Sequence, residues 1–353
     1  MNTAARRRHQ PQRCGPTARR RPGARGLALV LGMVILGLLD GLAGGTAPAA
    51  SQPPDPYRLL LVPSANTRIY SDVVDALRKN LSTGAGKRIS VTIYSPVELA
   101  QSVDRTGGFP QADLLIPIGT RAAVSISGYS SRIPVLFVLV PKTTYRSIIR
   151  RFHENFSAGR QHSALFVDHP VARHLDLARA VLPTKQRIGV LLGPTSRDQK
   201  ARLLAAARAR HLQLELRQVN DERELYQALQ DVLAHADMLL SLPDRAVYNS
   251  HTIRNILITA FRYRKPVIGY SESLVKAGAL TALYSTPQQI GRQLAEILLR
   301  RARDPQRRLP PPQAPEYSSV AVNYWVAQSL DIELPTHSEI ERRIHLRPEP
   351  DPD

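Results

Sequence analysis

The chain is poor in cysteine and in aromatic residues. It has one cysteine, Cys14, one tryptophan, and 5% aromatic residues in all. A single thiol excludes an intramolecular disulfide and a cysteine-based metal site. The ten histidines are scattered. His169 and His174, with Asp168 and Asp176 beside them, come nearest to a metal-binding set, but their spacing does not favour one. We therefore expect no metal site.

The chain also lacks the common sequence motifs of catalysis. It has no Gly-x-Ser-x-Gly elbow, no phosphate-binding loop and no Gly-x-Gly-x-x-Gly turn. Asp244 and Glu272 could form a carboxylate pair, but no nucleophile or metal-binding set accompanies them in the sequence. We therefore predict that the protein is not an enzyme and needs no cofactor, with an enzyme on the same fold as a minor alternative.

Acidic residues are in the minority. The 48 lysines and arginines exceed the 29 acidic residues, giving a net charge of +19 and a pI of about 10.6. Eight arginines fall within the first 50 residues. Most of the others lie on expected helix surfaces and in short tails such as "RRARDPQRR", without the interleaved aromatics of a nucleic-acid groove. We expect a solvated basic surface and no nucleic-acid partner.

The N-terminus has the composition of an export signal. The basic stretch "RRRPGARG" precedes the apolar run "LALVLGMVILGLL" and the sequence Ala47-Pro48-Ala49. These three parts together are typical of a secretory signal peptide, and a run of this length is short of the roughly 20 residues that span a bilayer. We predict a signal peptide at residues 1–50, a linker at 51–56 and a periplasmic location. An uncleaved membrane anchor is the alternative.

From residue 57 onward, apolar runs alternate with segments of helical periodicity. The runs "YRLLLVPS", "ADLLIPIGT" and "IPVLFVLVP" have counterparts in "RIGVLLGPTS", "ADMLLSLPD" and "KPVIGYS". Strands that are apolar throughout indicate parallel sheets covered on both faces. The sequence predicts an α/β protein with two doubly wound parallel-sheet lobes. The first takes residues 57–164 with part of 284–337, the second takes 165–283, and 338–353 form a flexible tail. We expect "ALTALYS" to be a strand that returns to the first lobe.

Short polar segments follow these apolar runs. Ligands of open parallel α/β sheets bind at the carboxyl ends of the strands. Thr120 and Ser196 would open helices toward an anionic group, Asp244 and Glu272 would accept a ligand amine, and the tyrosines would stack on a ring. The alternative for each residue is an ordinary turn or N-cap role. The predicted ligand-binding residues are Ser64, Asn66, Tyr70, Gly119, Thr120, Thr143, Tyr145, Ser196, Asp244, Tyr248, Ser271 and Glu272.

One long block resembles a known family. The stretch "ADMLLSLPDRAVYNSHTIRNILITAFRYRKPVIGYSESLVKAGALTALYSTPQQIGRQLAEILL" is similar to substrate-binding proteins of ABC transporters, in the family with tryptophan- and tyrosine-binding members. "ADLLIPIGTRAA", "VLPTKQRIGVLLGPTSRDQ" and "VAVNYWVAQSLDIELP" extend the resemblance over about residues 57–337. It implies a periplasmic-binding-protein type 1 fold with a hinge and a central cleft. It also implies a small-molecule ligand and an ABC permease and ATPase as partners.

The chain departs from that family in two loops of the first lobe. "KTTYRSIIRRFHENF" stands where the family has an Asp-Pro dipeptide and a Gly-Leu-Val stretch, and "SAGRQHSALFVDHP" replaces its Asn-Val-Thr-Gly stretch. These loops would shape the first-lobe side of the cleft, so a relative's ligand does not transfer to this chain. We expect a small, amino-acid-like ligand. The alternative is a membrane-tethered or periplasmic sensor or assembly protein that keeps the fold without transport.

Overall fold

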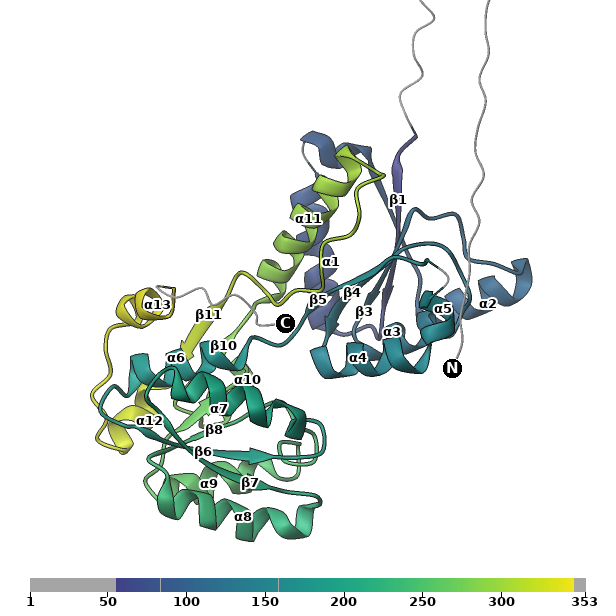
Figure 1. Cartoon of the computed structure of the whole chain (residues 1–353). Helices are drawn as coiled ribbons and strands as arrows, with labels where there is room; N and C mark the ends of the chain where they lie inside the picture. Colours follow the sequence, from purple (N-terminus) through teal and green to yellow (C-terminus); the bar gives the residue numbers. More distant parts are fainter. Residues whose placement is uncertain (1–54, 83, 158, 346–353) are drawn as a thin grey trace, which may run out of the picture. The chain divides into compact units, whose positions relative to one another are not determined.

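The computed structural model describes residues 55–82, 84–157 and 159–345. The predicted signal peptide and most of the predicted linker lie outside the described residues. The described chain builds two β-sheets with helices on both faces, and we call each sheet with its helices a lobe (Figure 1). In this part of the chain, no helix has both the length and the apolar character needed to cross a bilayer.

The first lobe is built on a five-stranded sheet in the order β2-β1-β3-β4-β5, with all strands parallel. Its strands are β1 (Tyr57–Pro63), β2 (Ile89–Ile93), β3 (Leu114–Ile118), β4 (Val135–Val140) and β5 (His162–Phe166). Its helices are α1 (Arg68–Leu81), the 3-10 helix η1 (Gly84–Arg88), α2 (Pro96–Thr106), α3 (Thr120–Ser127), α4 (Lys142–Arg151), α5 (His153–Ser157) and α11 (Pro287–Arg303).

Alternate residues of β1 explain why helices cover both faces of this sheet. Leu59 and Leu61 pack with residues of α1 and α11, whereas Leu60 and Val62 pack with residues of α2 to α5. All four are almost fully buried. Because burying one such side chain contributes roughly 1.5–3 kcal/mol, a continuous apolar strand is stable only between two helical layers.

The second lobe is built on a six-stranded sheet in the order β11-β10-β9-β8-β6-β7, parallel except for β11. Its strands are β6 (Arg187–Leu192), β7 (Gln213–Gln218), β8 (Met238–Leu240), β9 (Val267–Gly269), β10 (Thr281–Tyr284) and β11 (Ser319–Val322). Its helices are α6 (Val171–Val181), η2 (Arg197–Gln199), α7 (Lys200–Arg208), α8 (Glu222–His235), α9 (Ile253–Arg262), α10 (Glu272–Ala277), α12 (Tyr324–Ser329) and α13 (His337–His345). The predicted class, α/β with two mostly parallel sheets, is confirmed.

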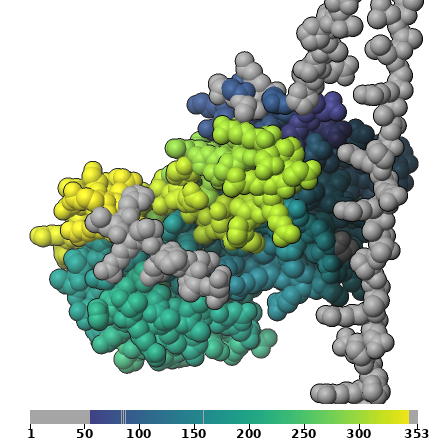
Figure 2. Space-filling view, turned by 45° about the horizontal axis from the view of Figure 1, so that its top comes forward, coloured from purple at the N-terminus to yellow at the C-terminus, as the bar shows by residue number. Residues whose placement is uncertain are grey.

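Two expectations about the C-terminal third were wrong. The strand in "ALTALYS" does not return to the first lobe, because β10 pairs with β9 and β11 of the second sheet. The tail predicted from residue 338 instead contains α13. Its residues Ile340 and Ile344 are buried in the second-lobe core, and Figure 2 shows this helix, in yellow, against the teal surface that includes α6.

Three segments carry the chain between the sheets, after β5, after β10 and before β11. Side-chain hydrogen bonds join them. His169 Nε2 lies 2.9 Å from Ser285 Oγ, which donates to the Tyr317 carbonyl oxygen at 2.6 Å. Burial, together with repulsion from a protonated His174 and from Arg173, lowers the pKa of His169 to about 3. Burial, together with Arg173, lowers the pKa of His174 to about 4. Both rings are therefore neutral at physiological pH.

Candidate functional site

The carboxyl edge of the first sheet is organised around Ser64. Its N–H donates to the Ile118 carbonyl oxygen at 2.9 Å, which holds the ends of β1 and β3 together. Its Oγ accepts a 2.9 Å hydrogen bond from the N–H of Ala122, in the first turn of α3. Ser64 is buried, so it acts from a neighbouring strand as a cap for this helix.

Gly119 connects β3 to α3 and lies beside two predicted site residues. Its φ of 88° and ψ of 168° belong to a region that glycine alone adopts readily. A Cβ at this position would overlap the Tyr70 hydroxyl and lie 2.8 Å from Ser64 Oγ. The structure therefore brings Ser64, Tyr70 and Gly119 together, with Tyr70 contributed by α1.

The N-terminus of α3 is open. Thr120 is its exposed first residue, no side chain caps it from the preceding residue, and its first turn contains no acidic residue. Within the described part of the chain, the backbone N–H groups of Thr120 and Arg121 have no hydrogen-bond partner. Free N–H groups at a helix N-terminus are suited to an anion.

Three other first-lobe residues lie apart from this group. Asn66 is exposed in the loop after β1, and Thr143 is half-buried in the first turn of α4. Tyr145 was expected to face a ligand, but its ring packs edge-on against Phe137 in the core. Its hydroxyl lies 2.7 Å from His162 Nδ1, and burial raises its pKa to about 12. It has core partners, so we withdraw the ligand role.

At the corresponding edge of the second sheet, Asp244 fills the turn after β6. Its Oδ2 accepts hydrogen bonds from the Thr195 N–H at 2.9 Å and from the Ser196 N–H and Oγ, both at 2.8 Å. Its Oδ1 accepts from the Ala246 N–H at 3.0 Å. Gly193 makes room for it, because a Cβ there would overlap the carboxylate.

This arrangement corrects the sequence interpretation of two residues. Ser196 and Asp244 are 0% and 4% exposed. The Ser196 N–H already binds a carboxylate, so it is not free for a ligand anion. Asp244 already has several charge-assisted hydrogen bonds, so it does not need a ligand amine. The ordinary capping role, which the sequence left open, describes Asp244 better.

Two tyrosines lie beside Asp244. Tyr248, after β8, is buried, and its hydroxyl has no hydrogen-bond partner in the described chain. Its ring meets that of Tyr270 edge-on at a centroid distance of 6.3 Å. Burial raises the pKa of both hydroxyls, and the negative Asp244 adds to this. Tyr270 is only partly buried. It was missing from the predicted ligand-binding residues, although it directly follows β9, as several of those residues follow other strands.

Ser271 and Glu272 begin α10. The Ser271 Oγ accepts from the Leu274 N–H at 3.3 Å, the geometry of an N-cap. The exposed Glu272 carboxylate forms an ion pair with Lys276 at 2.8 Å. Ser271 therefore has the ordinary capping role, while Glu272 keeps an accessible carboxylate at this edge.

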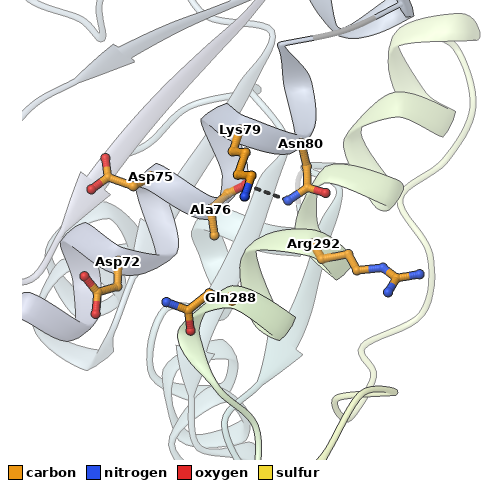
Figure 3. Close-up of a pocket in the computed structure, with 7 residues that line it drawn as sticks. All are labelled: Asp72, Asp75, Ala76, Lys79, Asn80, Gln288 and Arg292. Carbon is orange, nitrogen blue, oxygen red and sulfur yellow. Dashed lines mark hydrogen bonds between the residues drawn. The ribbon is translucent and has the colours of Figure 1, made fainter.

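A separate surface pocket lies between α1 and α11 (Figure 3). Asp72 and Asp75 line it together with Lys79 and Arg292, and the Asn80 side chain donates to the Ala76 carbonyl oxygen at 2.7 Å. It is an open hollow of mixed charge on the helical layer, away from the carboxyl edge of the sheet. No predicted site residue lines it, and no group of three or more potential metal ligands occurs in the described chain.

The two parallel α/β lobes, each with a polar carboxyl edge, define a two-lobed binding-protein fold. The model of the ABC transporter substrate binding protein family matches residues 92–339. The chain therefore belongs to this family, and its general role is solute binding.

Solved structures agree with this fold. A substrate binding protein with adhesive properties from Clostridium difficile, in a ligand-free, open structure, is similar with a TM-score of 0.62 and 16% identity, covering 80% of this chain and 97% of that one. A conserved domain protein from Vibrio cholerae gives 0.55 and 20%, covering 81% and 97%. An ABC domain in complex with L-Trp from Streptococcus pneumonia gives 0.55 and 14%, covering 81% and 98%. No curated protein sequence matches the chain.

Proposed function

We propose that the protein is an exported solute-binding protein that holds a small, amino-acid-like molecule between its lobes and delivers it to an ABC permease and ATPase. Family membership supports the transport role. The observation that carries the ligand class is the open N-terminus of α3 at the carboxyl edge of the first sheet. The L-Trp complex of a structurally similar protein is consistent with this class but belongs to that protein.

The ligand carboxylate would bind at the start of α3. The free N–H groups of Thr120 and Arg121 and the exposed Thr120 hydroxyl are its donors. The partial positive charge of a helix N-terminus adds to the attraction. Ser64 and Tyr70 form the floor of this region beside Gly119.

The second lobe would contact the rest of the ligand. Tyr270 has a partly exposed ring next to Tyr248, which suits an apolar or aromatic group. The exposed Glu272 carboxylate would accept from a ligand amine in place of Asp244, whose oxygens are occupied by Thr195, Ser196 and Ala246.

Thermal-shift screening of the chain that starts after Ala50, against a panel of amino acids, tests the ligand class. A ligand at ~100 times its Kd stabilises the folded state by about 2.7 kcal/mol. For a hit, we expect Thr120→Asp to weaken binding about tenfold or more, because the added carboxylate repels an anion at the helix N-terminus. Ser130→Asp, at an exposed position beyond the other end of α3, is the matched control. Equal affinities of these two variants would contradict the α3 site, and a panel without a hit would contradict the ligand class.

Export is tested separately by sequencing the N-terminus of the protein recovered from the periplasm. We expect it to begin near Ala49 or Ala50, because the basic segment, short apolar run and Ala47-Pro48-Ala49 precede that point. A periplasmic protein that still begins before Gly26 would exclude cleavage and favour the anchored form.

A further inference from the structure

An exposed group of large apolar side chains lies where α9 and α12 meet. Trp325 is 70% exposed and Phe261 41% exposed, and their rings stack with a centroid distance of 6.4 Å and an interplanar angle of 12°. Isolated exposed apolar residues are common, but a contiguous group marks an interaction surface. We call the following set the aromatic surface: Ile258, Phe261, Tyr263, Tyr324 and Trp325, all exposed.

Contacts between the ends of α9 and α12 lie beside the aromatic surface. Arg264 and Asp331, which follow α9 and α12, form an ion pair at 2.6 Å beside the ring stack. Both have left-handed backbone conformations, with φ of 54° and 55°. Such conformations are uncommon outside glycine, so both helix ends turn sharply to meet each other. Below the surface, Ala260 and Val326 anchor the two helices in the cores on the two sides of the second sheet.

The aromatic surface lies at the amino-terminal edge of the second sheet. α9 ends just before β9 begins. Val322, which ends the antiparallel β11, pairs with Thr281, the first residue of β10. The carboxyl edge with Asp244 and Ser271 is the opposite end of these strands. The rings of Phe261 and Trp325 therefore lie at the end of the strands opposite the proposed ligand edge, while Arg254, in the first turn of α9, lies nearer to that edge.

The surroundings of the aromatic surface are basic. The chain has no acidic residue between Asp244 and Glu272. Arg254 and Arg262 are exposed on α9, and neither has an ion-pair partner within the described residues. The nearby acids on the other segment are Asp331, which is paired with Arg264, and the exposed Glu333. Charge complementarity therefore calls for an anionic occupant.

Arginines combined with tryptophan and tyrosine are typical of surfaces that rest at the membrane–water boundary. There the rings lie at the level of the headgroups, and basic residues nearby are attracted to the anionic surface. We propose that the aromatic surface docks the second lobe onto a membrane rich in anionic lipids, with Trp325 and Phe261 at headgroup depth and Arg254 and Arg262 against lipid phosphates.

Trp325 makes the proposal directly measurable, because it is the only tryptophan in the whole sequence. The full chain is mixed with vesicles of phosphatidylglycerol and phosphatidylcholine in equal amounts, or of phosphatidylcholine alone. With the anionic vesicles we expect a blue shift of Trp325 emission and quenching by lipids brominated near the headgroup. We expect no shift with the neutral vesicles, and a smaller shift at high salt.

Charge variants test the basic rim. Arg254→Gln with Arg262→Gln should weaken binding to the anionic vesicles about tenfold or more. Arg78→Gln with Arg105→Gln is the matched control, since it removes the same charge from exposed positions on α1 and α2. It should bind like the parent chain. Equal affinities of the two double variants would overturn the proposal.

Two further outcomes would also overturn it. If the chain sediments with anionic vesicles but Trp325 emission stays unchanged, another part of the chain makes the contact; the apolar run near the N-terminus contains no tryptophan. If emission shifts with protein concentration in the absence of lipid, and sedimentation shows dimers, a second copy of the chain covers the surface.

Discussion

The two lobes differ in how they satisfy the backbone N–H groups of turns at the carboxyl ends of their inner strands. In the first lobe, the turn into α3 leaves the N–H groups of Thr120 and Arg121 without a described partner. In the second lobe, the turn after β6 gives its N–H groups to Asp244, which lies 48 residues from Ser196 in the sequence. The turn in the first lobe leaves backbone N–H groups open, whereas the turn in the second lobe binds a carboxylate of the chain itself.

The difference follows from the capping groups. The Ser64 hydroxyl accepts one N–H of the first turn of α3, which leaves other donors free. The two oxygens of Asp244 accept from three backbone N–H groups and one hydroxyl. Similar strand endings therefore give one turn that can receive a ligand anion and one turn that is a structural element of the lobe.

The largest expected effect is that of Asp244→Ala. This change leaves the buried N–H and hydroxyl of Ser196, and the partly buried N–H of Thr195, without their acceptor, which should lower the free energy of unfolding by about 3 kcal/mol or more. Urea unfolding measures it. Thr120→Ala at the open turn is the matched control and should change stability by less than about 0.5 kcal/mol. Equal losses in the two variants would mean that the two turns are not different in the way described.

Gly119→Ala should lower stability by about 2–3 kcal/mol. Alanine is strained at φ 88°, and its Cβ would also press on the Tyr70 hydroxyl. Gly107→Ala separates these causes, because Gly107 has a φ of 72° with open space around it. We expect a smaller loss there, and partial rescue of Gly119→Ala by Tyr70→Phe. A Gly107→Ala loss as large as that of Gly119→Ala would argue against the close approach at Gly119.

Acid should lower the stability of the chain through the buried His174, whose ring lies against that of His169 near the junction between the lobes. The folded-state pKa of His174, about 4, lies below the unfolded value of about 6.5. As pH falls, the unfolded chain therefore binds a proton first, so stability is full above about pH 6.5 and decreases toward pH 4. For this histidine the loss at pH 5 is about 2 kcal/mol.

The variant His174→Leu isolates that contribution. Between pH 8 and pH 5 it should lose about 2 kcal/mol less stability than the parent chain, measured by urea unfolding at each pH. Other titrating groups are common to both chains and cancel in the difference. Identical pH dependence of the two chains would show that His174 does not titrate as its burial requires.

The smallest effect is expected for Ser64→Ala, which removes the cap of the open turn. Losing one N-cap acceptor costs about 1 kcal/mol, well below the loss expected for Asp244→Ala. Ser71→Ala on α1 removes an exposed hydroxyl that bonds to the backbone of its own helix and should change stability by less than about 0.5 kcal/mol. If Ser64→Ala costs as much as Asp244→Ala, the contrast between the caps is wrong.

The fold class could be predicted from the sequence because most of the strands are apolar throughout. Leu59 to Val62 and Ile188 to Leu192 read as buried strands with no knowledge of their neighbours. The sequence did not show which sheet a strand joins, because β10 would be equally apolar in either lobe. α13 was missed because its sequence is mostly polar, although Ile340 and Ile344, one helical turn apart, were a usable sign.

Only part of the arrangement at the candidate site could be predicted from the sequence. Position after a strand placed Ser64, Gly119 and Thr120 at one edge of the first sheet, where they lie close together, but it could not show that Asp244 turns back onto Ser196. That contact depends on two strands lying side by side, which residue spacing does not encode. Tyr145 illustrates the same limit: its place after β4 suggested an edge, whereas the aromatic core around Phe137 takes its ring.

The Arg301 side chain donates to the Tyr57 hydroxyl at 2.8 Å across 244 residues of sequence. α11 therefore completes the layer over the first sheet only after nearly the whole second lobe has been synthesised. The second lobe in turn waits for β11 and α13. A ribosome adding ~5–20 residues per second would thus expose the first lobe without its α11 layer, and the second lobe without β11 and α13, until each of these segments emerges. Each lobe therefore depends on segments that follow most of its sheet in the sequence: α11 for the first lobe, and β11 and α13 for the second.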